Sequence, residues 1–329
     1  MSRRLLLSGL AVVTLVGAAI TYVVHARTGG ATENAVPVVT GQPMTLEART
    51  LFFRNLADGP DSGRLAAVPV GDPGAARRVG ELHCDRFAAA RSTAICLRLK
   101  PGSLPPLTDM IVLDANLHER HRETLPGTPS RARVSPDGRI VNWTVFVTGD
   151  SYAATGFSTR TGLYEVDTGR LVKTIEELAV FVHGKRYFAS DVNYWGVTFG
   201  ADGNRFYVTL GSRGKTYLIE ADYRAYRGTA IAENVECPSL SPDGRRIAFK
   251  QKVATGTWRL AVLDLTTHQI IHPPESRSVD DQPVWQGNST LLYPLRNATN
   301  SSDTWSVGLT TPPKLLIPQA DTPSFSSPN

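Results

Sequence analysis

The sequence predicts an all-β fold: a six-bladed β-propeller closed by its C-terminal strand and preceded by one N-terminal transmembrane or signal helix. Three observations lead to this prediction. A strand–turn–strand motif recurs along the chain, further strand-like segments follow each copy, and the chain ends on a segment typical of a lone inner strand. Repeats of this length with four strands each are typical of propeller blades.

The repeated motif is a hairpin with the sequence Ser-Pro-Asp-Gly at its turn. Residues 134–141 and 240–249 carry complete copies, and residues 199–208 and 285–293 carry weaker ones. Proline fixes φ at the start of the turn, aspartate bonds to nearby backbone, and glycine accepts the positive φ that ends it. The predicted turn residues are Ser135, Pro136, Asp137 and Gly138 in one copy and Ser241, Pro242, Asp243 and Gly244 in the other.

Two more strands are expected after each hairpin. One unit continues with residues 258–264 and 269–271, and another with residues 162–166 and 170–172. These segments are rich in the apolar and β-branched residues that strands favour, and polar residues typical of turns separate them. Four strands recurring about every 40 to 65 residues form one blade.

The number of predicted inner strands gives the number of blades. The inner strands lead into Phe87, Val134, Phe199, Leu240, Trp285 and Phe325. No blade follows the last of them, and no inner strand precedes the first blade, near residues 50–54. We therefore expect the C-terminal strand to complete the N-terminal blade, which closes the ring and removes open sheet edges.

Residues 1–26 are predicted to be a membrane anchor or a signal peptide. Residues 5–24 carry no charge and follow Arg3 and Arg4. A segment of about 20 apolar residues can cross a bilayer as a helix, and the preceding arginines place the N-terminus in the cytoplasm. The alternative is a cleaved signal peptide and a secreted protein. Residues 27–48 are interpreted as a linker, and residues 49–329 as the propeller, outside the cytoplasm.

The three cysteines fit an extracytoplasmic location. Cys84 and Cys96 flank a predicted hairpin, so their side chains can lie opposite each other. A disulfide between them is expected in an oxidising compartment, and two reduced buried thiols are the alternative. Cys237 is left over and is predicted to be a small buried apolar side chain.

Composition and motifs argue against several classes of function. The net charge of +5 is spread along the chain without a basic run, so no nucleic-acid partner is expected. Residues 149–153 lack the final glycine of a nucleophile elbow, and residues 118–121 space two histidines too closely for a zinc-binding helix. We therefore predict no catalytic residue and no organic cofactor.

One set of polar residues stands at a common position before the inner strands. Four residues ahead of each aligned strand residue lie His83, Ser130, Trp195, Glu236, Asp281 and Asp321. Inner strands line the channel, so His83, Glu236, Asp281 and Asp321 are candidates for a divalent-cation site at its mouth. The alternative is a hydrated polar channel mouth without a bound ion.

The hairpins at residues 135–138 and 241–244, each followed by an apolar strand, resemble the repeats of TolB-like propellers. The likeness covers about residues 48–329. It implies a six-bladed ring and a role in binding proteins in the bacterial cell envelope. The separate N-terminal domain of those proteins has no counterpart here, where the hydrophobic segment and the linker stand in its place.

Two hypotheses of function follow. The first is a non-catalytic, membrane-anchored propeller that binds an envelope protein or peptide. Its candidate aromatic anchors are Tyr194, Trp195, Tyr223 and Tyr226, for which blade core is the alternative interpretation. The second is a metal-dependent, lactonase-like hydrolase that uses the central channel, with the four candidate ligands and an open position for substrate.

Overall fold

The computed structural model describes residues 14–18, 21, 36–147 and 158–326. The chain divides into two compact units, Met1–Pro37 and Val38–Asn329. In the first unit, residues 14–18 are helical. No helix in the described part of the chain is long and apolar enough to cross a membrane. Most of the predicted anchor, residues 5–24, lies outside the described residues, as does the stretch at 149–153.

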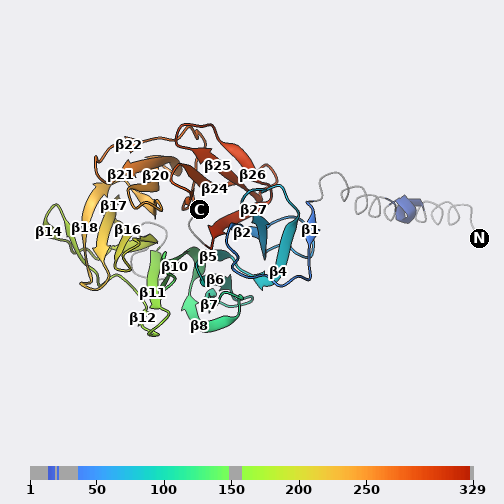
Figure 1. Ribbon diagram of the computed structural model, residues 1–329, viewed down its shortest axis with the longest axis horizontal. Coiled ribbons are helices and arrows are strands. Elements are labelled where there is room, and N and C mark those ends of the chain that lie inside the picture. The colour runs from blue at the N-terminus through green and yellow to red at the C-terminus, as the bar shows by residue number, and fades with distance from the viewer. Residues whose placement is uncertain (1–13, 19–20, 22–35, 148–157, 327–329) are drawn as a thin grey trace, which may run out of the picture. The chain divides into compact units, whose positions relative to one another are not determined.

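The second unit consists of six β-sheets arranged around a central axis (Figure 1). We number them as blades in chain order. Blade 1 has the strand order β1-β4-β3-β2-β27, blade 2 has β5-β6-β7-β8, and blade 3 has β9-β10-β11-β12. Blade 4 has β15-β16-β17-β18-β13-β14, blade 5 has β19-β20-β21-β22, and blade 6 has β23-β24-β25-β26. The predicted six-bladed propeller is therefore confirmed.

The strand bounds follow the predicted repeats. Blade 1 contains β1 (Val38–Val39), β2 (Thr50–Asn55), β3 (Arg64–Pro69), β4 (Arg77–His83) and β27 (Ala320–Phe325). Blade 2 contains β5 (Arg86–Ala90), β6 (Thr93–Leu99), β7 (Leu107–Leu113) and β8 (Glu119–Pro126). Blade 3 contains β9 (Thr128–Val134), β10 (Ile140–Val147), β11 (Ser158–Glu165) and β12 (Leu171–Val172).

The second half of the ring is built in the same way. Blade 4 contains β13 (Ala179–Val182), β14 (Lys185–Arg186), β15 (Asn193–Phe199), β16 (Arg205–Ser212), β17 (Lys215–Asp222) and β18 (Arg227–Glu233). Blade 5 contains β19 (Glu236–Leu240), β20 (Arg246–Ala254), β21 (Thr257–Asp264) and β22 (Ile270–Ile271). Blade 6 contains β23 (Val284–Gln286), β24 (Thr290–Arg296), β25 (Ser302–Gly308) and β26 (Lys314–Ile317).

The ring is closed by the C-terminal strand, as predicted. β27 is the inner strand of blade 1 and pairs antiparallel with β2, so that Phe325 lies opposite Leu51 and Asp321 lies opposite Arg54. This pairing joins the two ends of the propeller within one sheet. The inner strands of the other blades are β5, β9, β15, β19 and β23, each at one end of its sheet.

Hydrophobic cores lie between consecutive blades. Six clusters of buried side chains are present, and each draws on two neighbouring blades around the ring. Between blades 5 and 6, for example, Leu260 and Val262 pack with Leu291 and Tyr293. Because each blade buries its faces against its neighbours, the outward edge of the ring and the channel are left for polar groups.

The Ser-Pro-Asp-Gly turns are held by their own side chains. The Ser135 hydroxyl accepts a hydrogen bond from Ile140 N–H at 2.9 Å and donates one to Asp137 at 2.6 Å. Asp137 also accepts the Arg139 N–H at 3.1 Å. Gly138 has a φ of 78°, a backbone conformation that residues other than glycine rarely adopt. The turn at residues 241–244 repeats these contacts.

The predicted disulfide is present. Cys84, just before β5, is bonded to Cys96 on β6, and both lie in the core between blades 1 and 2. Cys237 is free and buried, as expected. Its φ is 51°, and a Cβ added to Gly196 would lie 2.7 Å from its Cα. This close contact between β15 and β19 fixes the inner strands of blades 4 and 5 against each other.

Three short strands lie outside the predicted four-stranded pattern. In blade 4, β13 pairs parallel with β18, and β14 forms the sheet edge beyond it. In blade 1, β1 pairs parallel with β4, although its residues fall in the predicted linker 27–48. The second compact unit, Val38–Asn329, includes this strand.

Candidate functional site

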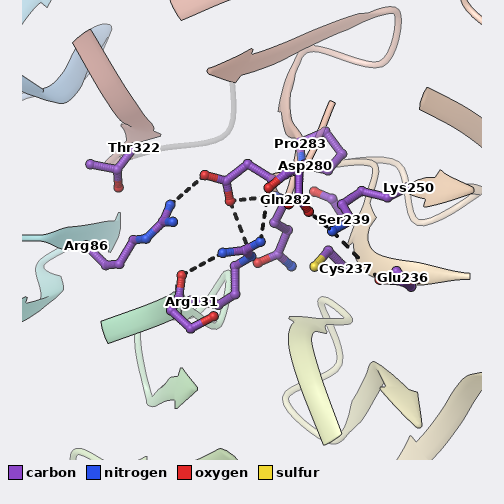
Figure 2. A network of polar contacts seen from close by, with 12 residues as sticks. Arg86, Arg131, Glu236, Cys237, Ser239, Lys250, Asp280, Gln282, Pro283 and Thr322 are labelled. Atoms are coloured by element: carbon purple, nitrogen blue, oxygen red, sulfur yellow. Dashed lines mark hydrogen bonds and ion pairs between the residues drawn. The ribbon is translucent and has the colours of Figure 1, made fainter. Parts of the chain in front are cut away.

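The centre of the channel is crossed by a network of ion pairs. Asp281, in the loop before β23, lies 2.6 Å from the Arg86 guanidinium of β5 and 3.2 Å from Arg131 Nε of β9. The Gln282 N–H donates a hydrogen bond of 2.7 Å to the same carboxylate. Figure 2 shows how Arg86, Arg131 and Gln282 converge from separate blades. We call these four residues the ion-pair plug.

Electrostatics keep Asp281 ionised at neutral pH. Burial alone would raise the pKa of this carboxyl group, but the guanidiniums of Arg131 and Arg86 and the hydrogen bond from Gln282 N–H outweigh it. The pKa of Asp281 is therefore held well below its ordinary range. Burial likewise opposes the charge of Arg131, yet the neighbouring carboxylate raises its pKa above the usual value. Each charge of this pair depends on the other.

Glu236 belongs to a second cluster beside the plug. Its carboxylate lies 3.7 Å from Lys250 Nζ and accepts a hydrogen bond of 3.0 Å from Trp258 Nε1. Lys250 is buried, also pairs with Asp280, and stands 4.4 Å from the centre of the Trp258 ring. Figure 2 shows Glu236, Lys250 and Asp280 close together on the blade 5 side of the channel. Glu236 therefore neutralises a buried lysine.

Asp321, on β27, is engaged by an arginine of the neighbouring strand. Arg54 donates from Nε at 2.9 Å and from Nη2 at 2.6 Å, a two-point contact with one carboxylate. The same guanidinium pairs with Asp85 at 3.0 Å. The carboxylate of Asp321 thus fixes β2 to β27 at the point where the ring closes.

The structure places three of the four predicted ligands around the channel but not His83. Glu236 opens β19, Asp281 precedes β23, and Asp321 lies on β27. His83 is instead the exposed last residue of β4, opposite Arg64 on β3. The sequence alignment that placed His83 at the channel is off by three residues at β5. This strand continues to Ala90 before its turn, so Arg86, and not His83, occupies the channel position.

No metal site is assembled from these side chains. Across residues 36–147 and 158–326 and the few described before them, no group of three or more His, Cys, Asp or Glu residues is arranged to hold a metal ion. The three acids are each paired with a cation of their own. A divalent cation would have to displace Arg86, Lys250 or Arg54 from a salt bridge to reach them.

Two cavities open on opposite ends of the inner strands. The wide cavity, of about 1110 Å³, is bordered by blades 1 and 6 and includes Asp321 at the start of β27. The turn-side cavity, of about 390 Å³, includes Phe325 at the other end of β27. A space of about 20 Å³ between them shares Asp281 with the first and Arg133 with the second. The ion-pair plug therefore separates the two cavities.

The candidate aromatic anchors are mainly core residues. Tyr194 and Tyr223 are buried in the cluster between blades 3 and 4, and Tyr226 packs against it. The Trp195 ring covers Gly211 on the next strand, where an added Cβ would lie 2.5 Å from the ring. The blade-core interpretation is the correct one for Tyr194 and Tyr223. An aromatic residue that does face a cavity is Trp305, in the wide cavity.

Sequence reasoning missed the cations of the channel. Arg86, Arg131, Arg133 and Lys250 all lie on inner or adjacent strands within the site. The signal that could have found them is their position, since Arg86, Arg131 and Lys250 each stand next to apolar or small residues within a strand. A charged residue in such a strand is expected to meet an opposite charge inside the fold.

Comparison with known proteins supports the fold. No protein-family model matches the sequence, and a comparison with curated proteins finds no match. Among solved structures, TolB from Acinetobacter baumannii has a TM-score of 0.56 and 16% identity, covering 87% of this chain and 68% of that chain. A putative TolB from Agrobacterium tumefaciens has a TM-score of 0.51 and 13% identity, covering 86% and 94%.

The structure of an enzyme is similar as well. An oligogalacturonate lyase in complex with manganese has a TM-score of 0.51 and 12% identity, covering 80% of this chain and 74% of that chain. At these identities the likeness concerns the fold alone. The chain has a TolB-like six-bladed propeller fold, and a fold by itself does not determine function.

Proposed function

We propose that this chain is a non-catalytic propeller that is held at a bacterial cell membrane by residues 5–24 and binds a protein or peptide partner outside the cytoplasm. The observation that carries the proposal is the internal pairing of the channel acids. Asp281, Glu236 and Asp321 each neutralise a cation of the fold, so none is free to act as a ligand or a base. What the ring offers to other molecules is its surface and its two cavities.

The wide cavity suits a protein partner. Its border combines an aromatic ring, Trp305, with the Arg277 guanidinium stacked 3.8 Å from the ring centre. Tryptophan and arginine are the residues that most often dominate binding energy at protein interfaces. The hairpin turn between β24 and β25 contributes Asn300, and the turn between β2 and β3 contributes Ser62. A rigid ring that presents mixed charge around an aromatic centre can recognise a segment of a folded partner.

Two features support a location outside the cytoplasm. The Cys84–Cys96 disulfide is typical of proteins that fold in an oxidising compartment. The uncharged segment 5–24 after Arg3 and Arg4 has the length and flanking charge of a single membrane span with a cytoplasmic N-terminus. A secreted protein with a cleaved signal peptide is the alternative outcome.

The proposal is tested by site-specific photo-crosslinking of the full-length protein in cells. A crosslinking amino acid at Ser62 or Asn300, both exposed at the wide cavity, is expected to yield one discrete adduct in the membrane fraction. Thr266, exposed between β21 and β22, is the matched control and should yield none. The same adduct should disappear when Trp305 is replaced by alanine.

Equal adducts from Ser62, Asn300 and Thr266 would mean that the wide cavity is not the binding surface. Recovery of the full-length protein only in the soluble fraction would contradict the membrane attachment and leave the binding role to be judged from the adducts alone.

A further inference from the structure

Arg133 is a cation of the channel without a counterion. It lies on β9, and its guanidinium borders both the turn-side cavity and the small space beside the plug. One nitrogen, Nη2, donates to the Pro283 carbonyl at 2.7 Å and to the Ser239 hydroxyl at 3.4 Å. Within the described part of the chain, the Nε and Nη1 groups have no hydrogen-bond acceptor, and no carboxylate lies within ion-pair distance.

The nearest carboxylate is already committed. Asp281 is shared between Arg86 and Arg131, so three guanidiniums surround one acid. Burial lowers the pKa of Arg133 to about 10. The negative charge of Asp281 raises this pKa, but the positive charge of Arg131 partly cancels that effect. An arginine normally keeps a much higher pKa. The charge of Arg133 is thus costly to the folded protein and would be stabilised by an additional anion.

The cavity beside Arg133 is apolar and reaches all six blades. Its apolar lining includes Phe199, Leu240, Val284, Trp285 and Phe325, together with alanine and proline side chains. The acid of the lining is Asp243, whose carboxylate already accepts hydrogen bonds from the Ser241 hydroxyl and the Arg245 N–H. A volume of about 390 Å³ falls within the range of small-molecule sites.

We propose that the turn-side cavity binds the carboxylate of a ligand with an apolar body, with the carboxylate accepting a hydrogen bond from one of the free donors of Arg133, Nε or Nη1, and the body against Phe199, Leu240 and Trp285. Charge-assisted hydrogen bonds from a guanidinium to a carboxylate are strong when water is excluded. A few directed polar groups in an apolar cavity are the usual construction of a ligand site. This site is separate from the wide cavity, so it does not depend on the proposed partner surface.

Two sources can supply this chemistry: the C-terminal carboxylate of a peptide that ends in an apolar residue, and a free aliphatic acid. Titration of the full-length protein with acetyl-Ala-Ala-Leu bearing a free carboxylate, with the C-terminal amide of the same peptide, and with hexanoate distinguishes them. Both acids are expected to bind saturably if the shared chemistry is sufficient. Binding of the peptide acid alone would identify the peptide as the ligand.

Arg133→Gln is expected to weaken binding of the acid about 10-fold to 100-fold, the effect of losing a charge-assisted hydrogen bond. Arg133→Lys should recover part of the affinity because it retains the charge. Arg245→Gln is the matched control, an exposed arginine of the adjacent turn, and should leave affinity unchanged. Equal affinity for the acid and the amide, an unaltered affinity in Arg133→Gln, or no binding of either acid at millimolar concentration would overturn the proposal.

One further variant keeps the test decisive. Leu240→Trp fills the cavity without touching the charge, and it should abolish binding even if Arg133→Gln fails to fold.

Discussion

Replacing Asp281 by alanine is expected to lower the free energy of unfolding by about 3–5 kcal/mol, the usual cost of removing one partner of a buried ion pair. The substitution leaves Arg86 and Arg131 facing each other and Arg133 in the channel, without the carboxylate that attracts all three. Denaturant unfolding of the full-length protein, followed by circular dichroism, measures the change.

Two control variants sharpen this prediction. Asp281→Asn keeps the shape of the side chain and an acceptor for Gln282 N–H but loses the charge, so it isolates the electrostatic part. Glu81→Ala removes an exposed acid of β4 and should have no measurable effect. A loss for Asp281→Ala no larger than that for Glu81→Ala would show that the plug does not stabilise the ring.

The same pair predicts a dependence of stability on pH. The pKa of Asp281 is lower in the folded protein than in the unfolded chain, where it is about 3.9. The contribution of Asp281 to the free energy of unfolding is therefore fully present above about pH 4. It is lost as the pH falls toward the pKa of Asp281 in the folded protein. The stability difference between the wild type and Asp281→Asn should shrink below about pH 4 and stay constant near neutrality.

Loss of the Cys84–Cys96 disulfide is expected to cost about 3 kcal/mol, because the bond limits the conformations of the unfolded chain across a sequence separation of 12 residues. Both cysteines also lie in the core between blades 1 and 2, and reduction removes the covalent bond that holds the two sulfur atoms together there. The double variant Cys84→Ser, Cys96→Ser should therefore unfold at lower denaturant concentration. The transition midpoint measures the difference.

A reductant provides the control for the disulfide. It should destabilise the wild type to about the level of the double variant and leave the double variant unchanged. A wild type that is equally stable with and without reductant would mean that the bond contributes nothing to the fold.

The fold was predictable because its information is local and repeated. The turn at residues 135–138 is held by hydrogen bonds among Ser135, Asp137 and residues within five positions of them, so its sequence specifies its shape. The hairpin recurs in successive blades, and the ring closure follows from an inner strand without a blade after it. β13 and β14 were missed because they carry no such turn and join blade 4 through a parallel pairing with β18.

The site was predictable only in part, because its contacts are distant in sequence. Arg54 and Asp321 are separated by 267 positions, and Arg86 and Asp281 by 195. An alignment of the inner strands shows that acids occupy the same position relative to several strands. It does not show which cationic side chains form ion pairs with them. His83 was misplaced for a more local reason: the two-residue turn after Ala90 is shorter than the Ser-Pro-Asp-Gly turns, and this shifts β5 against the other inner strands.

The channel acids Asp281, Glu236 and Asp321 are paired with cations of the fold, and we infer that they do not bind metal ions. The measurement that tests this claim most directly is a thermal melt of the full-length protein with EDTA and then with Mg²⁺, Ca²⁺, Mn²⁺ or Zn²⁺. A cation that binds only the folded state raises the melting temperature in proportion to its occupancy. The predicted result is the same melting temperature in every condition. A saturable rise with one cation that is lost in Asp281→Asn would contradict the account and favour a metal-dependent hydrolase acting in the channel.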